Sequence, residues 1–215
     1  MTSLREQFIE NTDKERVRLQ AAIDQLLPSI RTVPIANRAL MPFGWRKAAK
    51  GRTVWRIIEE VISQNLEAHA KELGFETFDH AESEVGVYDF SYSFEQSQTS
   101  FVNIKSAVAG TRSSKDDISK AVRLLEHYEK YPQADFYIAT FEMRFTSTPS
   151  VTIDDCVVMP LAWIPDVYVN PSNNGNLQSS HAKHLDKAIK RTNDEFLTEL
   201  KSANEIAVQK RRKGR

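Results

Sequence analysis

The stretch that decides the fold reads Val87-Tyr-Asp-Phe-Ser-Tyr92, then a polar segment, then Phe101-Val-Asn-Ile-Lys-Ser106. Both ends are short and rich in β-branched and aromatic residues, which is typical of β-strands, and the run from Glu95 to Thr99 between them is typical of a turn. We therefore expect a β-hairpin, which brings residues from both strands onto one small, half-buried surface.

The register of this hairpin decides which side chains meet. Side chains alternate between the two faces of a strand, so Asn103 and Lys105 share one face of the second strand. Asp89 joins them only if odd-numbered residues pair with odd-numbered residues, because a shift of one residue turns a side chain to the other face. We expect this register because the even-numbered side chains then form one apolar face, made of Tyr88, Phe90, Val102 and Ile104.

Asp89, a spacer of 13 residues, and Asn103-Ile104-Lys105 together resemble the PD-(D/E)xK core of nucleases, and of type II restriction endonucleases in particular. The sequence departs from that pattern at two positions: Tyr88 stands in place of proline, and Asn103 occupies the second acidic position. The resemblance implies an α/β domain with a restriction-endonuclease-like core, in which α-helices flank a central mixed β-sheet. The alternative is a structural role for Asp89 and Lys105, because such pairs also occur in domains without catalysis.

A helix is predicted from residue 52 to residue 73, capped by Thr53 or a neighbour and ended by Gly74. On a helical wheel Glu59 lies at the edge of the apolar stripe, whereas Glu60 points away from it. The stripe consists of Val54, Trp55, Ile58, Val61, Ile62 and Leu66.

A carboxylate that borders an apolar face requires a partner or a metal ion. By the resemblance, the helix before the catalytic hairpin supplies a glutamate to the metal site, and Glu59 matches that role in position and facing. The alternative is an ordinary glutamate that pairs with Arg56 or bonds to Ser63.

The resemblance implies hydrolysis of a phosphodiester with Mg²⁺ as cofactor. Asp89 and Glu59 would hold the ion, which polarises the phosphate and lowers the pKa of a bound water, and the carbonyl of Ile104 could be a third ligand. Lys105 would orient or deprotonate the water and offset the charge on the phosphate. Asn103 would either coordinate through its amide oxygen or position water.

The charges are unevenly distributed along the chain, although the formal net charge is zero. Seven basic residues and no acidic one lie between Arg31 and Ile58. Residues 29–51 should be irregular, because proline and glycine punctuate them. Basic and apolar side chains alternate there, which suits a loop that follows a duplex backbone and presses into a groove; the alternative is an arm that packs its apolar residues on the core. The DNA-binding candidates are Arg31, Arg38, Met41, Arg46, Lys47, Lys50 and Arg52, together with Arg112 after the hairpin.

A second resemblance to restriction endonucleases lies between Val167 and Ser179, where Asn-Pro and Gly-Asn-Leu-Gln precede a predicted C-terminal helix. Asparagine and glutamine can bond to adenine with two hydrogen bonds in the major groove, and glycine lets the backbone approach closely. The alternative is a loop rich in turns, with asparagines in left-handed conformations. The candidates for reading bases are Asn173, Asn174, Asn176 and Gln178.

The remaining elements complete a sheet of mixed strand direction, because a helix and then strands follow the hairpin. A first helix, whose stripe includes Leu4 and Val17, should be ended by a proline. A later helix should have a serine cap and two aspartates in its first turn. The predicted elements are helices at 3–28, from Ser113 or Ser114 to about 131, and at 180–208, and strands at 135–145 and 151–163.

The composition indicates one soluble globular domain over residues 1–215, with a basic tail at 210–215, because 40% of residues are apolar and 27% are charged. No apolar run is long enough for a transmembrane helix. The single cysteine, Cys156, has apolar neighbours and is expected to be a buried structural thiol, which fits a prokaryotic cytoplasm.

The sequence has no glycine-rich phosphate loop, nucleophile elbow or zinc pattern. His181 and His184 could hold a metal ion only with a third ligand, which the sequence does not place near them.

Together these features predict a type II site-specific deoxyribonuclease that cuts double-stranded DNA at a short palindromic sequence. One chain offers one site, so cutting both strands requires a symmetric homodimer. The alternatives are a structure-specific nuclease of the resolvase or repair type, and a catalytically inactive DNA-binding protein of the same fold, which Asn103 would favour.

Overall fold

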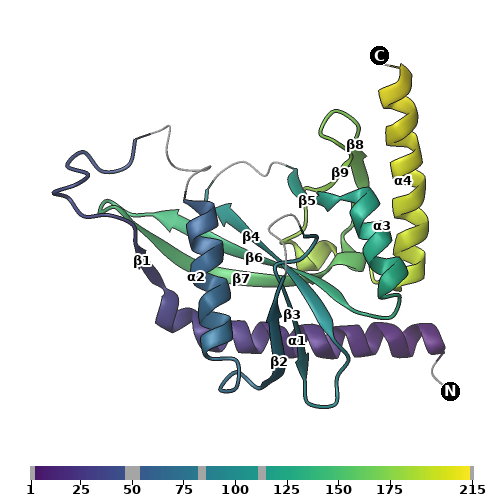
Figure 1. Cartoon of the computed structure of the whole chain (residues 1–215), viewed down its shortest axis with the longest axis horizontal. Coiled ribbons are helices and arrows are strands. Elements are labelled where there is room, and N and C mark those ends of the chain that lie inside the picture. The colour runs from purple at the N-terminus through teal and green to yellow at the C-terminus, as the bar shows by residue number, and fades with distance from the viewer. Residues whose placement is uncertain (1–2, 47–53, 82–85, 111–114, 214–215) are drawn as a thin grey trace.

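The computed structural model of the chain describes residues 3–46, 54–81, 86–110 and 115–213. Within them, a six-stranded sheet has the order β1-β7-β6-β4-β3-β2 (Figure 1). Strands β4 and β6 are parallel and the other neighbours are antiparallel, so the expected α/β fold with a mixed central sheet is confirmed. The strands are β1 (Thr32–Pro34), β2 (Phe75–His80), β3 (Phe90–Phe94), β4 (Ser100–Val108), β6 (Phe136–Phe145) and β7 (Ser150–Pro160).

Helices cover both faces of this sheet. The helices α1 (Leu4–Ile30) and α2 (Trp55–Ala68) share one apolar core with it, and α3 (Ala121–Lys130) and α4 (Asn193–Lys213) share the other. A small antiparallel sheet lies on the side of α3 and α4 and consists of β5 (Asp116–Lys120), β9 (Asn176–Ser179) and β8 (Tyr168–Asn170). Two short 3₁₀ helices, η1 (Leu161–Trp163) and η2 (Leu185–Lys187), complete the description.

The alternation of apolar residues along the central strands explains the two cores. In β6, Tyr137 and Ala139 belong to the core with α1 and α2, whereas Phe136 and Ile138 belong to the core with α3 and α4. In β4, residues 100–104 are buried and burial relaxes from Lys105 onward. The expectation of a half-buried hairpin is therefore wrong for the first part of β4, because helices cover both of its sides.

The predicted hairpin and its register are present. Phe90 pairs with Val102 and Tyr92 with Ser100, so residues of like parity face each other. Residues 95–99 connect the two strands, as expected. The prediction that Tyr88 shares an apolar face with Phe90 is wrong. The centre of its ring lies 4.8 Å from that of Phe101, in the core on the opposite side of the sheet from Phe90, because the chain is still in a bend before β3 begins.

The first helix extends beyond its predicted end. It begins with a capping box between Ser3 and Glu6 and continues to Ile30, with Pro28 inside its last turn. A proline there removes only one backbone hydrogen bond close to the helix end, so it does not stop the helix. The predicted stripe is wrong in part, because Leu4 and Val17 are exposed.

Three later segments also differ from the expectation. The predicted capped helix starts later, since residues 116–120 form β5 paired with β9, and the proposed caps Ser113 and Ser114 lie outside the described residues. The loop at 167–179 is the β8–β9 hairpin. The last helix begins at Asn193 and includes the basic residues 210–213, so the tail is helical as far as it is described. No helix in the described part of the chain has the length and apolar character needed to cross a bilayer.

Candidate active site

An open groove of about 1160 Å³ lies where α2 faces the beginning of β3 and the middle of β4. The groove brings together all the residues predicted to act in catalysis, although they come from three separate elements. It is lined by Glu59, Asp89, Asn103, Ile104 and Lys105, and also by Trp55, Arg56, Ile57, Glu60, Val61, Ser63, Gln64, Glu67, Ala68, His80, Ala81, Gly86, Tyr88 and Ile118.

Asp89 is fixed by its backbone and by its carboxylate. Its N–H donates to the carbonyl of Val102 at 2.8 Å, and its carbonyl accepts from the N–H of Ala81 at 3.0 Å. Its carboxylate accepts a hydrogen bond from the backbone N–H of Ile104. Burial raises the pKa of Asp89, although this N–H and the positive charge of Lys105 oppose the shift. Asp89 is thus a preordered carboxylate in the bend just before β3, at the expected distance along the hairpin from Lys105.

Glu59 enters the groove from α2, as its position at the edge of the apolar stripe predicts. It is half-buried, whereas Glu60 is exposed and accepts a hydrogen bond from Gln64. Burial raises the pKa of Glu59 to about 8, the charges of Lys105 and Arg56 act against this, and the charge of Asp89 adds to it. The two carboxylates and Lys105 are therefore electrostatically coupled across the groove.

The side-chain amide of Asn103 uses its nitrogen in a hydrogen bond, whereas its oxygen has no partner in the described part of the chain. Its amide nitrogen donates to the carbonyl of Val87 at 3.0 Å, which ties β4 to the chain entering β3. Its amide oxygen is buried and has no partner within the described structure. Beside it, Thr140 of β6 is paired in register with Lys105, and its hydroxyl is also buried without a partner. Buried oxygens of this kind call for a partner, and proteins supply one with a water or an ion.

The donor set fits a magnesium ion. In the described part of the chain no three His, Cys, Asp or Glu residues cluster as metal ligands, so a cation would depend on two carboxylates and on neutral oxygens. Oxygen ligands are those that Mg²⁺ prefers, and it usually keeps several waters. Asp89 and Glu59 both have raised pKa values, and a divalent cation would stabilise both in the charged form.

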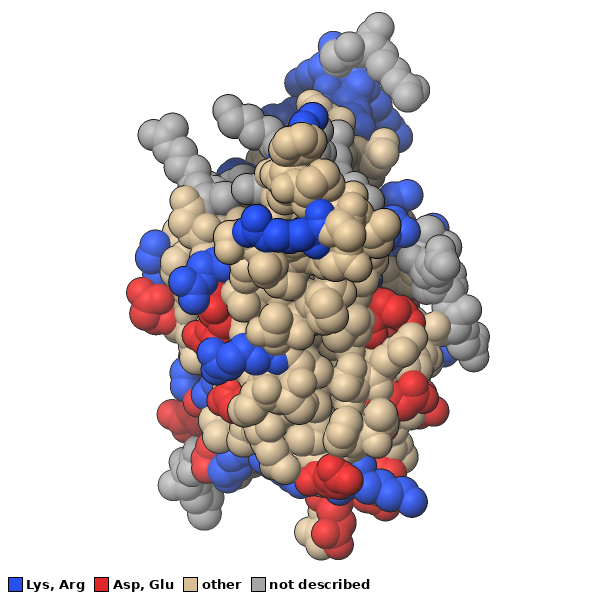
Figure 2. Space-filling model, turned by 90° about the vertical axis from the view of Figure 1, so that its left-hand side faces the viewer, with Lys and Arg blue, Asp and Glu red and all other residues tan. Residues whose placement is uncertain are grey.

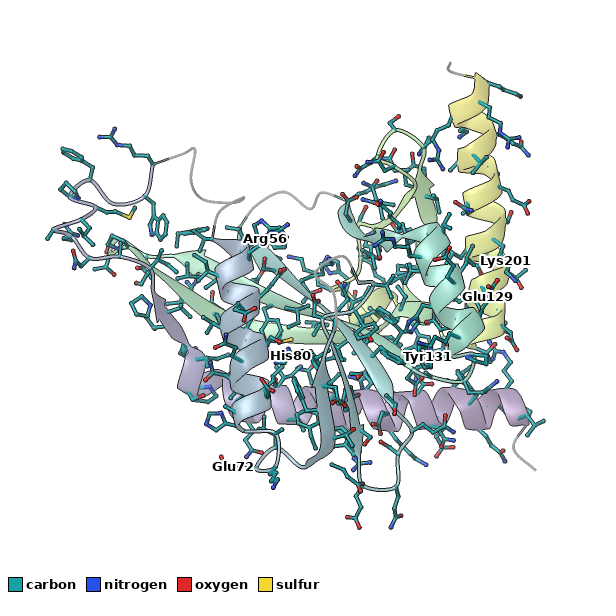
Figure 3. All side chains as sticks on the ribbon, viewed as in Figure 1. Arg56, Glu72, His80, Glu129, Tyr131 and Lys201 are labelled. Atoms are coloured by element: carbon teal, nitrogen blue, oxygen red, sulfur yellow. The ribbon has the colours of Figure 1, made fainter. Side chains whose placement is uncertain are left out.

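A hydrogen-bonded chain beside the site was not predicted. Ser63 bonds through its hydroxyl to Nδ1 of His80, which is labelled in Figure 3, at 3.1 Å, and Nε2 of His80 lies 2.6 Å from Glu67. Glu59, Ser63 and Glu67 are spaced four residues apart on α2, so they lie along one side of the helix. That spacing is visible in the sequence, but the partner from β2 is set by the fold.

The basic candidates in the described part of residues 31–46 are exposed. Arg31, Arg38 and Arg46 are open to solvent, and Met41 is half-buried. Figure 2 views the molecule from this side and shows Lys and Arg without Asp or Glu over its upper part, whereas both charges are mixed over its lower half. The remaining basic candidates, Lys47, Lys50, Arg52 and Arg112, lie outside the described residues.

The β8–β9 hairpin uses some of its candidate side chains internally. Asn173 and Gln178 each donate to the carboxylate of Asp117 at 2.6 Å. Asn174 is exposed at the tip with a φ of 52°, so this residue has the left-handed conformation of the alternative, a loop rich in turns. Asn176 is half-buried in β9, and its N–H donates to the carbonyl of Asn173.

Gly175 is buried at the base of this tip. A Cβ atom there would lie 3.1 Å from the guanidinium of Arg211 of α4. The glycine therefore allows the end of α4 to approach the hairpin, whereas the sequence interpretation assigned it a close approach to DNA.

Solved structures include chains that resemble this one. No protein-family model matches the chain, and no curated protein matches it. Among solved structures, the chain is similar to the NlaIV restriction endonuclease with a TM-score of 0.47 and 17% sequence identity, over 77% of this chain. The chain spans 66% of the length of that protein. A likeness of this size carries no argument about activity, so the functional argument depends on the groove.

Proposed function

We propose that the chain is a Mg²⁺-dependent deoxyribonuclease that hydrolyses phosphodiester bonds in double-stranded DNA. One observation carries the proposal: two half-buried carboxylates, Asp89 and Glu59, share a groove with Lys105 and are coupled to its charge. Burying two acids beside each other is costly, and catalytic sites are where such costs concentrate.

Each residue of the groove has a role that its surroundings support. Asp89 and Glu59 would hold Mg²⁺, and Asn103 would add the oxygen that lacks a partner. When bound, the ion would polarise the phosphate and lower the pKa of a water. Lys105 lies where burial of β4 relaxes, so its ammonium group could contact a phosphate or a water in the open groove. Its positive charge would offset the negative charge that develops on the phosphate.

Two basic or polar projections flank the site and suit a duplex. Residues 35–46 project at the left of Figure 1, and the β8–β9 hairpin and the end of α4 rise at the right. The first would bind the phosphate backbone through Arg38 and Arg46, and the second would present Asn174 to base edges. A duplex placed between them would lie over the groove.

The full proposal is a type II enzyme that acts as a homodimer on a palindromic sequence. One chain has one Asp89–Lys105 pair, and two copies related by a twofold axis would present one pair to each strand. A second candidate is a DNA-binding protein without catalysis, which Asn103 favours because an amide has no charge to replace the second carboxylate.

Incubation of the protein with plasmid DNA, in Mg²⁺ or in EDTA, distinguishes these functions. Discrete fragments that require Mg²⁺ support the proposal. Retarded but intact DNA in Mg²⁺ would favour the non-catalytic candidate. Cleavage restricted to branched DNA would replace the proposal with a structure-specific nuclease.

A further inference from the structure

Two large apolar side chains are exposed at the tip of the arm, which we define as residues 35–46. Leu40 is 76% exposed and Phe43 is 78% exposed. Burial of such side chains is favourable, and the arm leaves both of them in water. Two such side chains, three residues apart at one exposed tip, suit a surface that another molecule covers.

The arm is attached at both ends to the turn between β6 and β7. At one end, the N–H groups of Ile35 and Ala36 both donate to the carbonyl of Pro149 at 2.9 Å. At the other end, the ring of Trp45 packs edge-on against Phe145, with 4.9 Å between the ring centroids. The apolar residues near the two ends therefore pack on the core, and those at the tip do not.

Hydrogen bonds within the arm fix the shape of its tip. The N–H of Leu40 donates to the side-chain oxygen of Asn37 at 3.0 Å, and the N–H of Met41 donates to the carbonyl of Asn37 at 2.8 Å. Gly44 donates to the carbonyl of Met41 at 3.0 Å and has a φ of +61°, which favours glycine. A tip that is ordered before binding loses little entropy when it binds.

The charges around the tip identify the partner. Arg38 and Arg46 are exposed on either side of it, and the guanidinium of Arg46 lies 5.0 Å from the centre of the Phe43 ring. The sequence contains no acidic residue between Arg31 and Ile58. An apolar tip between two arginines complements a polyanion with stacked bases, because the cations meet phosphates and the apolar groups meet base faces.

We propose that Leu40 and Phe43 form a wedge that enters the minor groove, separates a base step and bends the duplex, while Arg38 and Arg46 bind the flanking phosphates. This rests on the proposed function, since it assumes that a duplex lies over the groove. It adds a deformation of DNA that the catalytic residues do not require. Sequence preference would then come in part from the ease with which a base step unstacks.

The test measures bending in a duplex of about 30 base pairs, which is short compared with the persistence length of DNA. Its ends carry a fluorescent donor and acceptor, and Ca²⁺ replaces Mg²⁺ so that bending is measured without cleavage. The proteins are the wild type, the double variant Leu40→Ala/Phe43→Ala, and the control Leu4→Ala. Leu4 is 85% exposed on α1, so the control removes an equally exposed apolar side chain elsewhere.

The wedge predicts that the wild type and Leu4→Ala bring the two ends of the labelled duplex closer together. The double variant should bind the duplex about tenfold more weakly and leave its ends apart. Thermal melting checks that the variants are folded, as expected for exposed positions. Equal bending by the double variant, or no bending by the wild type, overturns the wedge. So does a dimer without DNA that dissociates in the double variant, since the tip would then contact a second copy.

The plasmid assay separates this inference from the proposed function. Cleavage by the wild type without bending would reject the wedge and keep the nuclease. Bending without cleavage in Mg²⁺ would support the wedge and reject the nuclease.

Discussion

At the scale of single residues, Glu59 and Glu60 are adjacent in sequence and differ in surroundings. We predict that Glu59→Gln reduces DNA cleavage by at least about 100-fold, because loss of a charged metal ligand is expected to cost that much in affinity or rate. Glu60→Gln should stay within about threefold of the wild type, since Glu60 is exposed and bonded to Gln64. The measurement is the initial rate of plasmid cleavage in Mg²⁺. Equal effects of the two substitutions would show that the role of Glu59 is misassigned.

His127 gives a prediction about pH that does not depend on DNA. Its ring is buried among Phe101, Tyr128 and Phe136, and burial, aided by the charge of Lys130, lowers its pKa to about 4. The unfolded chain takes up this proton near pH 6.5. The neutral His127 ring therefore costs no free energy of unfolding above pH 6.5. As the pH falls from 6.5 toward 4, the free energy of unfolding decreases by up to about 1.4 kcal/mol per pH unit.

The variant His127→Phe should reduce this pH dependence, because phenylalanine keeps the aromatic packing and takes up no proton. Denaturant unfolding of the wild type and the variant between pH 4 and pH 7 measures it. If the two proteins lose stability equally over this range, the group responsible is not His127.

At the residue scale, the alternation of side chains was enough to predict which residues meet. Asp89 and Lys105 share the groove because the register of a hairpin follows from its apolar face. Tyr88 was misplaced because a bend before β3 interrupts the alternation. The unpartnered oxygen of Asn103 could not be predicted, because it depends on the position of Val87 in three dimensions.

At the scale of elements, His80 connects α2, which carries Glu59, to β2. The next residue, Ala81, donates to the carbonyl of Asp89, so His80 lies beside the strand that carries the other carboxylate. His80 bonds to Ser63 and Glu67, which lie on the same side of α2 as Glu59, so we expect His80→Ala to loosen that side and to weaken Ca²⁺ binding in the presence of DNA about tenfold. Calorimetry measures it.

Two further variants make the His80 test specific. His80→Gln should restore part of the affinity, because an amide can still accept from Ser63 and donate to Glu67. His69→Ala is the control, since Nδ1 of His69 bonds to the carbonyl of Asn65 at the end of the same helix. Unchanged Ca²⁺ affinity in His80→Ala would remove the histidine from the positioning of Glu59.

The elements themselves were predictable where the periodicity is local. The hairpin, the strands β6 and β7 and the body of α2 follow from short patterns. Strand β5 was missed because Asp116 and Asp117 resemble the first turn of a helix, whereas pairing with β9, about sixty residues later, decides their structure. The last helix was predicted to begin too early in the sequence. The residues before Asn193 follow an irregular path along η1 and α1, where the N–H of Ile189 donates to the carbonyl of Trp163 and Lys190 bonds to Asp13.

At the scale of the whole molecule, the proposed dimer predicts a stoichiometry. Two chains should bind one palindromic duplex, because cutting both strands requires two Asp89–Lys105 pairs. Sedimentation of the protein with a short duplex that contains the mapped cleavage site measures the ratio. One chain per duplex, together with nicking of a single strand, would rule out the symmetric dimer.

Binding of the duplex should also weaken steeply as the salt concentration increases, because several phosphates are neutralised.

Substitution of Lys105 tests most directly whether the groove between α2 and β4 hydrolyses DNA. The decisive measurement compares plasmid cleavage in Mg²⁺ and duplex binding in Ca²⁺ for Lys105→Ala and for Lys201→Ala, a lysine on the outer side of α4 (Figure 3). Lys105→Ala should remain folded and bind the duplex, and cleave at least about 100-fold more slowly, because its charge offsets that of the reacting phosphate. Lys201→Ala should behave as the wild type. Cleavage by Lys105→Ala within a few-fold of the wild type would contradict the assignment of the active site.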